Sequence, residues 1–490
     1  MRLFLGFLLL FSSLLILSSN TYAQNFTGSW HCIYATQDDR PNGTGYPTAS
    51  VGVIKPNTFV ALVSRKTATT LTCYLVGYTN ASTLTGRMGV YGYGTNPPVA
   101  ADIRQPWASG FENIEMVEAY DIAVTKDSLV YVANNDVERN ILVFRMSADS
   151  VISTDYRLVT QADSLWGIDV DNNGRVYVGQ CGIGSNPGKI LVFKSIAEET
   201  AWLDQPHLST PLATINIPDP GRITGVTTNA EGTIVYASNY DADKVYCFTG
   251  SPTTGYTLYN GFNFTLTDQP MASNGVDTIF PGPIGLKYMQ DKNILMVSCA
   301  QLFRLGVAYE YSRVYMVNPN TGDIMNTLDA AGWSFAQTGS YTTPNDSVSA
   351  YNALYNSDYD ENFNVYTVSY YGWTVDKWYF DGVIPTIPVT ILGLEKTEGL
   401  TPTEFTLAQN YPNPFNPTTT IEFSLAENNV VNLNIYDVNG QLVAELINGA
   451  ILEKGTYKFS FDASKMASGL YIYTLQAGNK QLTKKMSLLK

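Results

Sequence analysis

Histidine is nearly absent from this chain, and neither of its two copies lies in a catalytic or metal-binding motif. His31 sits in a Trp-His-Cys triplet and His207 in a proline-flanked segment. The 490 residues also contain no Gly-x-Ser-x-Gly element and no phosphate-binding glycine loop. A histidine-based triad or metal centre therefore has little support. We interpret both histidines as surface or packing residues.

Basic residues are also scarce, with 29 Lys and Arg against 43 Asp and Glu and a net charge of −14. This balance argues against a nucleic-acid partner, because phosphate binding needs a basic face. The 90 residues from 401 onward carry seven lysines and seven acids, so the acidic excess lies before residue 400. It is typical of a soluble extracellular surface, with binding of cations or of a cationic partner as the alternative. A hydrophobic content of 45% excludes disorder for most of the length.

Cysteine is limited to five residues and no Cys-x-x-Cys pair occurs, which excludes zinc ribbons and c-type haem attachment. The count is odd and too low for a disulfide framework. We expect packing thiols in buried strands, with one disulfide as the alternative. The cysteines are Cys32, Cys73, Cys181, Cys247 and Cys299.

Long apolar runs are confined to the start of the chain. Arg2 precedes an apolar run over 3–17, and small residues lead to a cleavage point between Ala23 and Gln24. Residues 1–23 are therefore predicted to be a secretory signal peptide. No later stretch reaches the ~18 apolar residues of a membrane-spanning helix, so we predict an exported chain without a transmembrane span.

What the sequence does contain is a repeat over residues 24–385. Each unit has a buried strand, a polar turn, a second strand and a third apolar strand, and in several units the second strand carries a central tyrosine. An Ile-Leu-Val-Phe quartet closes two successive units, at 141–144 and 190–193. Six units are visible, at intervals of 46 to 69 residues. Their first strands start at Gly52, Asp121, Gly167, Gly225, Gly285 and Ala353.

One such sheet cannot bury its own apolar surface, and radial stacking solves this problem. The fold class is therefore predicted as all-β, and the rhythm resembles a β-propeller of the NHL and gluconolactonase-like type. Six blades are favoured, with seven as the alternative because 77–117 has room for an irregular blade. Ring closure needs a partner for the last unit, and we expect a strand within 26–35 to complete the blade that contains 365–380.

The C-terminal part of the chain has a different organisation. Residues 386–406 lose the repeat and are predicted to be a linker. Residues 407–490 show short alternating strands and an Asn439-Gly440 hairpin turn, which indicate a small immunoglobulin-like β-sandwich.

Residues 407–490 closely resemble the type A C-terminal sorting domain of the type IX secretion system of the Bacteroidetes–Chlorobi–Ignavibacteria group. The resemblance lies in an opening Asn-Tyr-Pro-Asn-Pro-Phe-Asn-Pro run, a central Asn-Gly turn, and a closing Gly-Leu-Tyr and Lys-Lys-Met. The signature residues are Asn410, Tyr411, Pro412, Asn413, Pro414, Phe415, Asn416, Pro417, Asn439, Gly440, Gly469, Tyr471, Lys484 and Lys485.

This resemblance implies export by the Sec route to the periplasm and then by the type IX outer-membrane translocon. It also implies contact with a sortase-like protease that removes the domain. The expected location is the outer cell surface or the medium.

Two parts of the sequence have features of a metal site. Asp169-x-Asp171-x-Asn173-Gly174 matches the opening of a calcium loop, but its twelfth position is Gln180 and a strand follows, so we favour a hairpin turn. Gluconolactonase-like enzymes hold a divalent metal in the central channel. At the strand starts of this chain only Asp121 is acidic, so we expect no resident cofactor, with calcium as the alternative.

We therefore predict a binding or interaction module with an extracellular protein or glycan ligand. Dense aromatic stretches at 370–373 and 378–379 are explained by blade packing or by stacking on such a ligand. The rival hypothesis is a secreted propeller hydrolase or lactonase with a metal in the channel.

Overall fold

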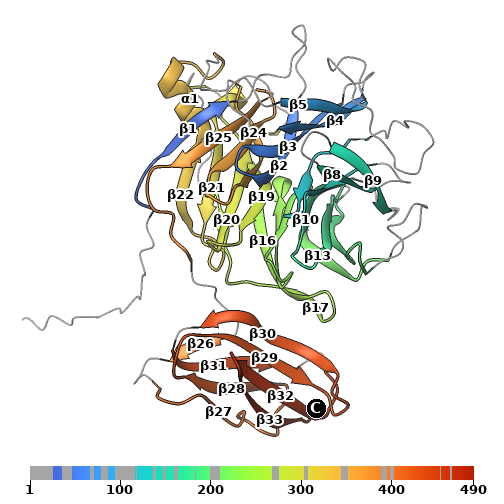
Figure 1. Cartoon of the computed structure of the whole chain (residues 1–490), viewed down its shortest axis with the longest axis vertical. Helices are drawn as coiled ribbons and strands as arrows, with labels where there is room; N and C mark the ends of the chain where they lie inside the picture. Colours follow the sequence, from blue (N-terminus) through green and yellow to red (C-terminus); the bar gives the residue numbers. More distant parts are fainter. Residues whose placement is uncertain are drawn as a thin grey trace, which may run out of the picture.

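The fold is described by a computed structural model (Figure 1). It describes residues 26–35, 47–66, 71–78, 87–93, 116, 118–135, 140–146, 151–158, 164–182, 184–198, 210–266, 275–276, 278–302, 307–343, 351–372, 374–387, 394–397, 402–452, 454–463 and 466–490.

Six antiparallel sheets occupy the larger, N-terminal part of the described chain (Figure 1). Five of them use strands that are consecutive in sequence. The first three are β2–β5 (Thr48–Lys55, Thr58–Lys66, Leu71–Tyr78, Arg87–Tyr93), β6–β9 (Ile122–Val124, Leu129–Ala133, Ile141–Met146, Val151–Leu158) and β10–β13 (Leu165–Val170, Val176–Gln180, Pro187–Phe193, Ala213–Pro220).

The fourth and fifth sheets continue this order. They are β14–β18 (Ile223–Thr228, Ile234–Asn239, Lys244–Ser251, Gly255–Leu258, Phe264–Thr265) and β19–β22 (Gly282–Met289, Ile294–Ala300, Ser312–Val317, Ile324–Asp329). The sixth sheet has the order β1-β25-β24-β23 (Trp30–Ala35, Thr374–Phe380, Val365–Ser369, Leu354–Tyr359).

The first strand of each unit lies on the inside of a ring. Strands β2, β6, β10, β14, β19 and β23 contact one another in this order, and β23 contacts β2 again. The six sheets are therefore the blades of a closed β-propeller, which confirms the predicted all-β propeller. In the described part of the chain the inner strands of neighbouring blades are in contact all round, so the seven-bladed alternative is wrong.

The ring is closed by the N-terminal strand, as predicted. β1 pairs with β25 from Trp30 opposite Phe380 to Ala35 opposite Asp376. The Trp30 indole donates to Asn326 Oδ1 at 2.7 Å, and the Tyr34 hydroxyl donates to Asn57 Oδ1 at 3.2 Å. Both aromatic side chains are buried, so β1 contributes to the core as well as to the sheet.

Glycines allow the inner strands to approach one another closely. A Cβ on Gly167 would lie 2.6 Å from the Gly225 backbone, and one on Gly225 would lie 2.5 Å from the Ile284 carbonyl oxygen. Real side chains do not tolerate such contacts, which explains the recurrence of glycine at the start of these units.

Helix is rare in the described residues. α1 (Ala330–Thr338) begins where Asp329 accepts a hydrogen bond from Gly332 N, and it ends at Gly339, whose φ is 69°. Two short 3-10 helices, η2 (Tyr240–Ala242) and η3 (Val307–Glu310), lie between strands. No helix in the described ranges combines the length and hydropathy needed to cross a membrane.

Two further sheets form the C-terminal unit (Figure 1). Ile421 and Phe423 from the first share a hydrophobic core with Leu433 and Tyr473 from the second. The sheets are β26-β31-β28-β27 (Leu394–Thr397, Gly455–Asp462, Thr418–Leu425, Thr406–Leu407) and β30-β29-β32-β33 (Leu442–Leu452, Asn429–Tyr436, Gly469–Ala477, Lys480–Leu488).

The start of the C-terminal unit differs from the expected linker over 386–406. β26 lies inside that segment and pairs with β31. At the other end, Ile387 is buried with propeller residues, and its backbone N–H donates to Lys292 O at 2.9 Å. The propeller therefore extends to Ile387, and the C-terminal unit begins by Leu394.

Candidate functional site

The propeller axis carries charged side chains that come from different blades. Strand register places Asp169, Thr227, Lys287 and Asp358 at equivalent positions. Each is paired with a residue near the start of the second strand of its blade, and these partners are Tyr177, Tyr236, Met296 and Tyr366. The residue two positions earlier is glycine for Asp169, Thr227 and Lys287, and Asn356 for Asp358.

Asp121 is a buried carboxylate that ties several inner strands together. Its Oδ1 accepts hydrogen bonds from Ser50 Oγ and from Asn356 Nδ2, both at 2.7 Å. Its oxygens also accept from the backbone N–H groups of Ile122, at 2.9 Å, and Ile168, at 3.0 Å. These donors lie on β2, β23, β6 and β10, so one side chain joins four of the six blades.

Lys287 is the cation of the axis and joins β19 to β10 and β23. Its Nζ lies 3.5 Å from Asp169 Oδ1 and 3.8 Å from Asp358 Oδ1. Burial alone would lower the pKa of Lys287, but the two carboxylates outweigh it and raise the pKa above its usual value. The lysine therefore remains charged.

The two carboxylates beside Lys287 have further donors. Asp169 Oδ2 accepts from Thr227 Oγ1 at 2.7 Å and from Thr228 N at 3.1 Å. Asp358 Oδ2 accepts from Val53 N at 2.7 Å. Together with Asp121, this network uses donors or acceptors from all six inner strands. Its carboxylate oxygens are therefore engaged by groups of the protein itself.

Asp121 is expected to make propeller stability depend on pH. Burial raises its pKa from 3.8 to about 7, although its hydrogen-bond donors oppose the shift. The folded state then holds a proton that the unfolded state releases, so this group stabilises the propeller below about pH 4 and loses that effect as the pH rises through about 7.

We expect the contribution of Asp121 to the free energy of unfolding to fall by roughly 4 kcal/mol over this pH range, since one pKa unit is worth about 1.4 kcal/mol. The Asp121→Asn variant should lose this dependence of the unfolding free energy on pH. The measurement is guanidinium unfolding at several pH values, followed by tryptophan fluorescence, because all seven tryptophans precede residue 400. An unchanged slope in the variant would contradict the assignment.

The calcium-loop candidate is resolved as a turn. Asp171 Oδ1 accepts from the backbone N–H groups of Asn173 and Arg175, both at 2.9 Å, while Asp169 binds Thr227 and Lys287 instead. The same turn recurs in the last blade, where Asp360 Oδ1 accepts from Asn362 N and Asn364 N. The two aspartates of the candidate loop thus serve different purposes, one on the axis and one in the hairpin.

No group of three or more His, Cys, Asp and Glu is placed to hold a metal ion in the ranges that the structure describes. His31 stacks on Tyr379, with ring centroids 5.2 Å apart, and bonds Asp381 through Nε2 at 3.0 Å. His207, Ala23 and Gln24 lie outside the described residues.

All five cysteines are unpaired, so the disulfide alternative is wrong. Burial raises the pKa of the Cys73 thiol to about 11, which keeps it protonated and unreactive. Of the dense aromatic residues, Tyr370 and Trp378 are buried and Tyr379 is 41% exposed. Blade packing therefore accounts for Tyr370 and Trp378, whereas Tyr379 remains at the surface and Trp373 lies outside the described residues.

The C-terminal signature residues are brought together from distant parts of the sequence. Asn410 is buried, and its Nδ2 donates to Thr419 Oγ1 at 2.9 Å. Phe415 is buried, and its backbone N–H donates to Ser487 O at 2.9 Å. Asn413 Oδ1 accepts from Ser487 N at 2.9 Å. The opening run and the lysine-rich end therefore form one continuous structure.

The other signature residues have simpler places. Asn439 and Gly440 form the turn between β29 and β30, where Gly440 has a φ of 81°, so the predicted hairpin is confirmed. Gly469 and Tyr471 lie at the start of β32, and the Tyr471 hydroxyl donates to Ala467 O. Lys484 and Lys485 lie on β33 and are exposed. Pro412, Pro414 and Asn416 are also exposed, and Pro417 is half-buried.

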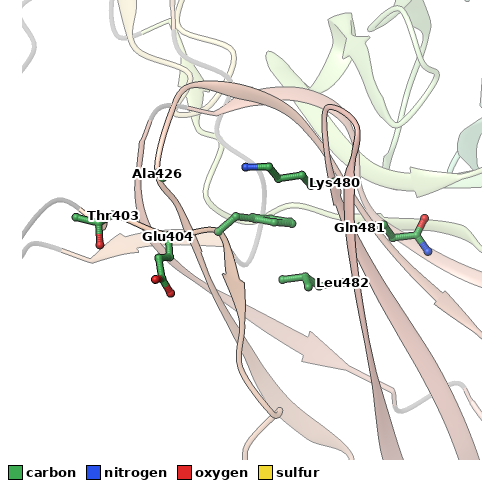
Figure 2. A pocket seen from close by; sticks show the side chains of 7 residues that line it. Thr403, Glu404, Ala426, Lys480, Gln481 and Leu482 are labelled. Carbon is green, nitrogen blue, oxygen red and sulfur yellow. The ribbon is translucent and has the colours of Figure 1, made fainter.

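An open pocket lies at the other end of β33, away from the signature residues. Figure 2 shows Lys480, Gln481 and Leu482 on one side and Thr403 and Glu404 on the other. Phe405 and Ala426 complete its lining. These residues combine one acid, one base and neutral groups, which is no catalytic constellation.

Comparison with known proteins identifies only the C-terminal part. Residues 409–488 match the family model of the secretion system C-terminal sorting domain. A comparison with curated proteins gives no match.

Solved structures that are similar include a gluconolactonase from Xanthomonas campestris (10% identity, TM-score 0.39, covering 73% of this chain and 92% of that one). A second is a Lactobacillus plantarum protein (11% identity, TM-score 0.37, covering 88% of this chain and 100% of that one). A third is the Malassezia sympodialis allergen Mala s 1 (10% identity, TM-score 0.33, covering 69% of this chain and 93% of that one). At these identities and TM-scores, the likeness carries no argument about activity, and the propeller is defined by its own strand pairing. The family match therefore identifies residues 409–488 as a secretion system C-terminal sorting domain, and strand pairing identifies the larger part before them as a β-propeller.

Proposed function

We propose that this chain is an extracellular binding module, carried by a six-bladed propeller and delivered by an immunoglobulin-like sorting domain. The supporting observation is the family match at 409–488, which marks the chain for export. In this proposal the chain crosses to the periplasm by the Sec route. The type IX translocon then exports it, and a sortase-like protease removes residues 407–490. The propeller remains at the cell surface or in the medium.

The axis supports binding rather than metal-dependent hydrolysis. Three carboxylates surround it, which is the observation in favour of a hydrolase or lactonase. Lys287, however, bridges Asp169 and Asp358, and its positive charge opposes a divalent cation at the same place. Asp121 accepts four hydrogen bonds within the protein. Ligand contact is therefore assigned to the outer surface of the propeller, where Tyr379 and His31 are exposed enough to stack on a sugar or a protein side chain.

Export is tested by truncation after Ile387 in a host with a type IX secretion system. The truncated chain should fold, because it keeps every described residue that packs within the propeller up to Ile387, and it should accumulate in the periplasm. Cell fractionation measures its location, and tryptophan fluorescence measures folding. Release of the folded, truncated chain into the medium would overturn the proposed route.

A further inference from the structure

Aromatic rings form a row from the core of the last blade to its outer edge. Trp378 is 2% exposed, and the Trp333 ring on α1 packs against it with ring centroids 6.0 Å apart. His31 on β1 contacts the Trp333 ring at 5.5 Å in an edge arrangement, and it stacks on Tyr379 at 5.2 Å. β1, β25 and α1 lie together at this edge of the propeller (Figure 1). Tyr379 is therefore the outermost ring of a row that begins in the core.

The Tyr379 ring has one covered face. His31 lies against it with an interplanar angle of 24°, and no other ring contacts Tyr379 in the described part of the chain. The residue is 41% exposed, so much of its surface faces solvent. Because the row behind it already fixes the ring, a ligand that stacks on Tyr379 orders few side-chain rotamers. The exposed side of Tyr379 is thus a preformed stacking surface.

An ionised carboxylate lies beside this stacking surface. His31 joins the two groups, because its ring stacks on Tyr379 and its Nε2 is hydrogen-bonded to Asp381 Oδ2 at 3.0 Å. The other oxygen, Asp381 Oδ1, accepts from the backbone N–H of Ser29. The Ser29 N–H and then His31 hold the pKa of Asp381 below its usual value. A carboxylate has about four acceptor positions, so these two contacts leave room for donors from a ligand.

We propose that Tyr379, His31 and Asp381 form a binding site for a neutral pyranose sugar of an extracellular glycan, here called the rim site. The C–H groups on the face of a pyranose carry a small positive charge, and they stack on the negative face of the Tyr379 ring. Hydroxyl groups on the same sugar donate to the Asp381 carboxylate. This inference rests on the proposed binding function and names the class of ligand.

The charge of the rim site selects against other ligands. An anionic sugar would approach Asp381 on a chain whose net charge is −14. An apolar protein side chain on Tyr379 would bring its neighbours over Asp381, and covering an ionised carboxylate without new donors is costly. Sugar hydroxyls supply those donors at no cost in charge. A cationic peptide is the competing class, and it is included in the test.

The test is binding of defined probes to the purified full-length chain, measured by ligand-observed NMR titration. The probes are cellopentaose, mannopentaose, galactotetraose and chitopentaose, with pentalysine as the competing ligand. At least one oligosaccharide should bind with a Kd on the order of 1 mM, as expected when one sugar of about a dozen non-hydrogen atoms makes the contact.

Variants of the rim site should separate stacking from hydrogen bonding. Tyr379→Ala should weaken sugar binding about tenfold or more, since it removes the aromatic contact. Tyr379→Phe should bind within about twofold of the parent chain, because stacking does not need the hydroxyl group. Asp381→Asn should weaken binding by roughly tenfold, since it replaces charged acceptors with a neutral one.

Tyr411→Ala is the matched control, because Tyr411 is a tyrosine of the C-terminal unit that is 81% exposed. It should bind the sugar as the parent chain does. The melting temperature should change little in the Tyr379 variants, because the residue lies at the surface. A clearly lowered melting temperature in Tyr379→Ala, together with weak binding in Tyr379→Phe, would assign Tyr379 to the fold and overturn the rim site.

The remaining outcomes also decide the proposal. Failure of all four oligosaccharides to bind overturns the rim site, and so does sugar binding that persists in Tyr379→Ala. Binding of pentalysine alone, lost in Asp381→Asn and at high salt, assigns the site to a cationic partner and overturns the sugar assignment. Export of the chain truncated after Ile387 is measured separately, so failure of the proposed delivery route is seen there and not in the sugar titrations.

Discussion

Deleting residues 26–35 should unfold the propeller or leave it with loosely packed blades. The deletion removes β1 from the last blade and exposes β25 as a sheet edge. It also removes Trp30 and Tyr34 from the core. Loss of one large buried aromatic side chain costs about 3–5 kcal/mol, and whole domains have a stability of about 5–15 kcal/mol. Two such losses therefore consume most or all of the stability.

Circular dichroism and guanidinium unfolding measure this effect. Point variants of the same strand provide the controls. Trp30→Ala should cost several kcal/mol, whereas Ile33→Ala should cost little because Ile33 is 44% exposed. Equal stability of the deletion variant and the parent chain would show that β1 adds nothing to the ring.

Replacing Lys287 by methionine should destabilise the propeller by about 3 kcal/mol or more. The variant leaves Asp169 and Asp358 without the cation between them, and breaking a buried pair costs about 3–5 kcal/mol. The lower end is expected because the Lys287 side chain is 21% exposed. Guanidinium unfolding followed by tryptophan fluorescence measures the change in the propeller alone.

Lys244→Met is the matched control for this variant. Lys244 lies 2.6 Å from Asp219, but its side chain is 54% exposed, so its loss should cost at most about 1 kcal/mol. Adding Asp169→Asn and Asp358→Asn to Lys287→Met should restore part of the stability, because the unpaired negative charges are removed. A cost for Lys287→Met no larger than that for Lys244→Met would show that the axis does not depend on this ion network.

The blade architecture could be predicted from the sequence because each unit repeats the same alternation. The closing strand could also be predicted, since a ring with an unpaired last blade would expose an edge. The axis could not. The repeat aligns the units at Gly167, Gly225 and Gly285, which are small residues, whereas the charged Asp169 and Lys287 lie two positions later.

In the last unit the axis residue is harder still to identify from the sequence. The sequence repeat aligns this unit at Ala353, but the backbone places Asn356, three residues further on, beside Gly285. Counting alternate positions from there would have found Asp358. β26 was missed for another reason: its four residues carry too little pattern to separate a strand from a linker, and only pairing with β31 identifies it.

The pairing of β1 with β25 also imposes an order on how the molecule is made. Trp30 is synthesised among the first residues and Phe380 some 350 residues later, yet they are direct neighbours in one sheet. Until β25 has been synthesised, β1 therefore has no strand to pair with. The ring becomes complete only when the last blade emerges, immediately ahead of the sorting domain. Such distant pairing slows folding, so we expect closure of the ring to be a late step that follows synthesis of the other five blades.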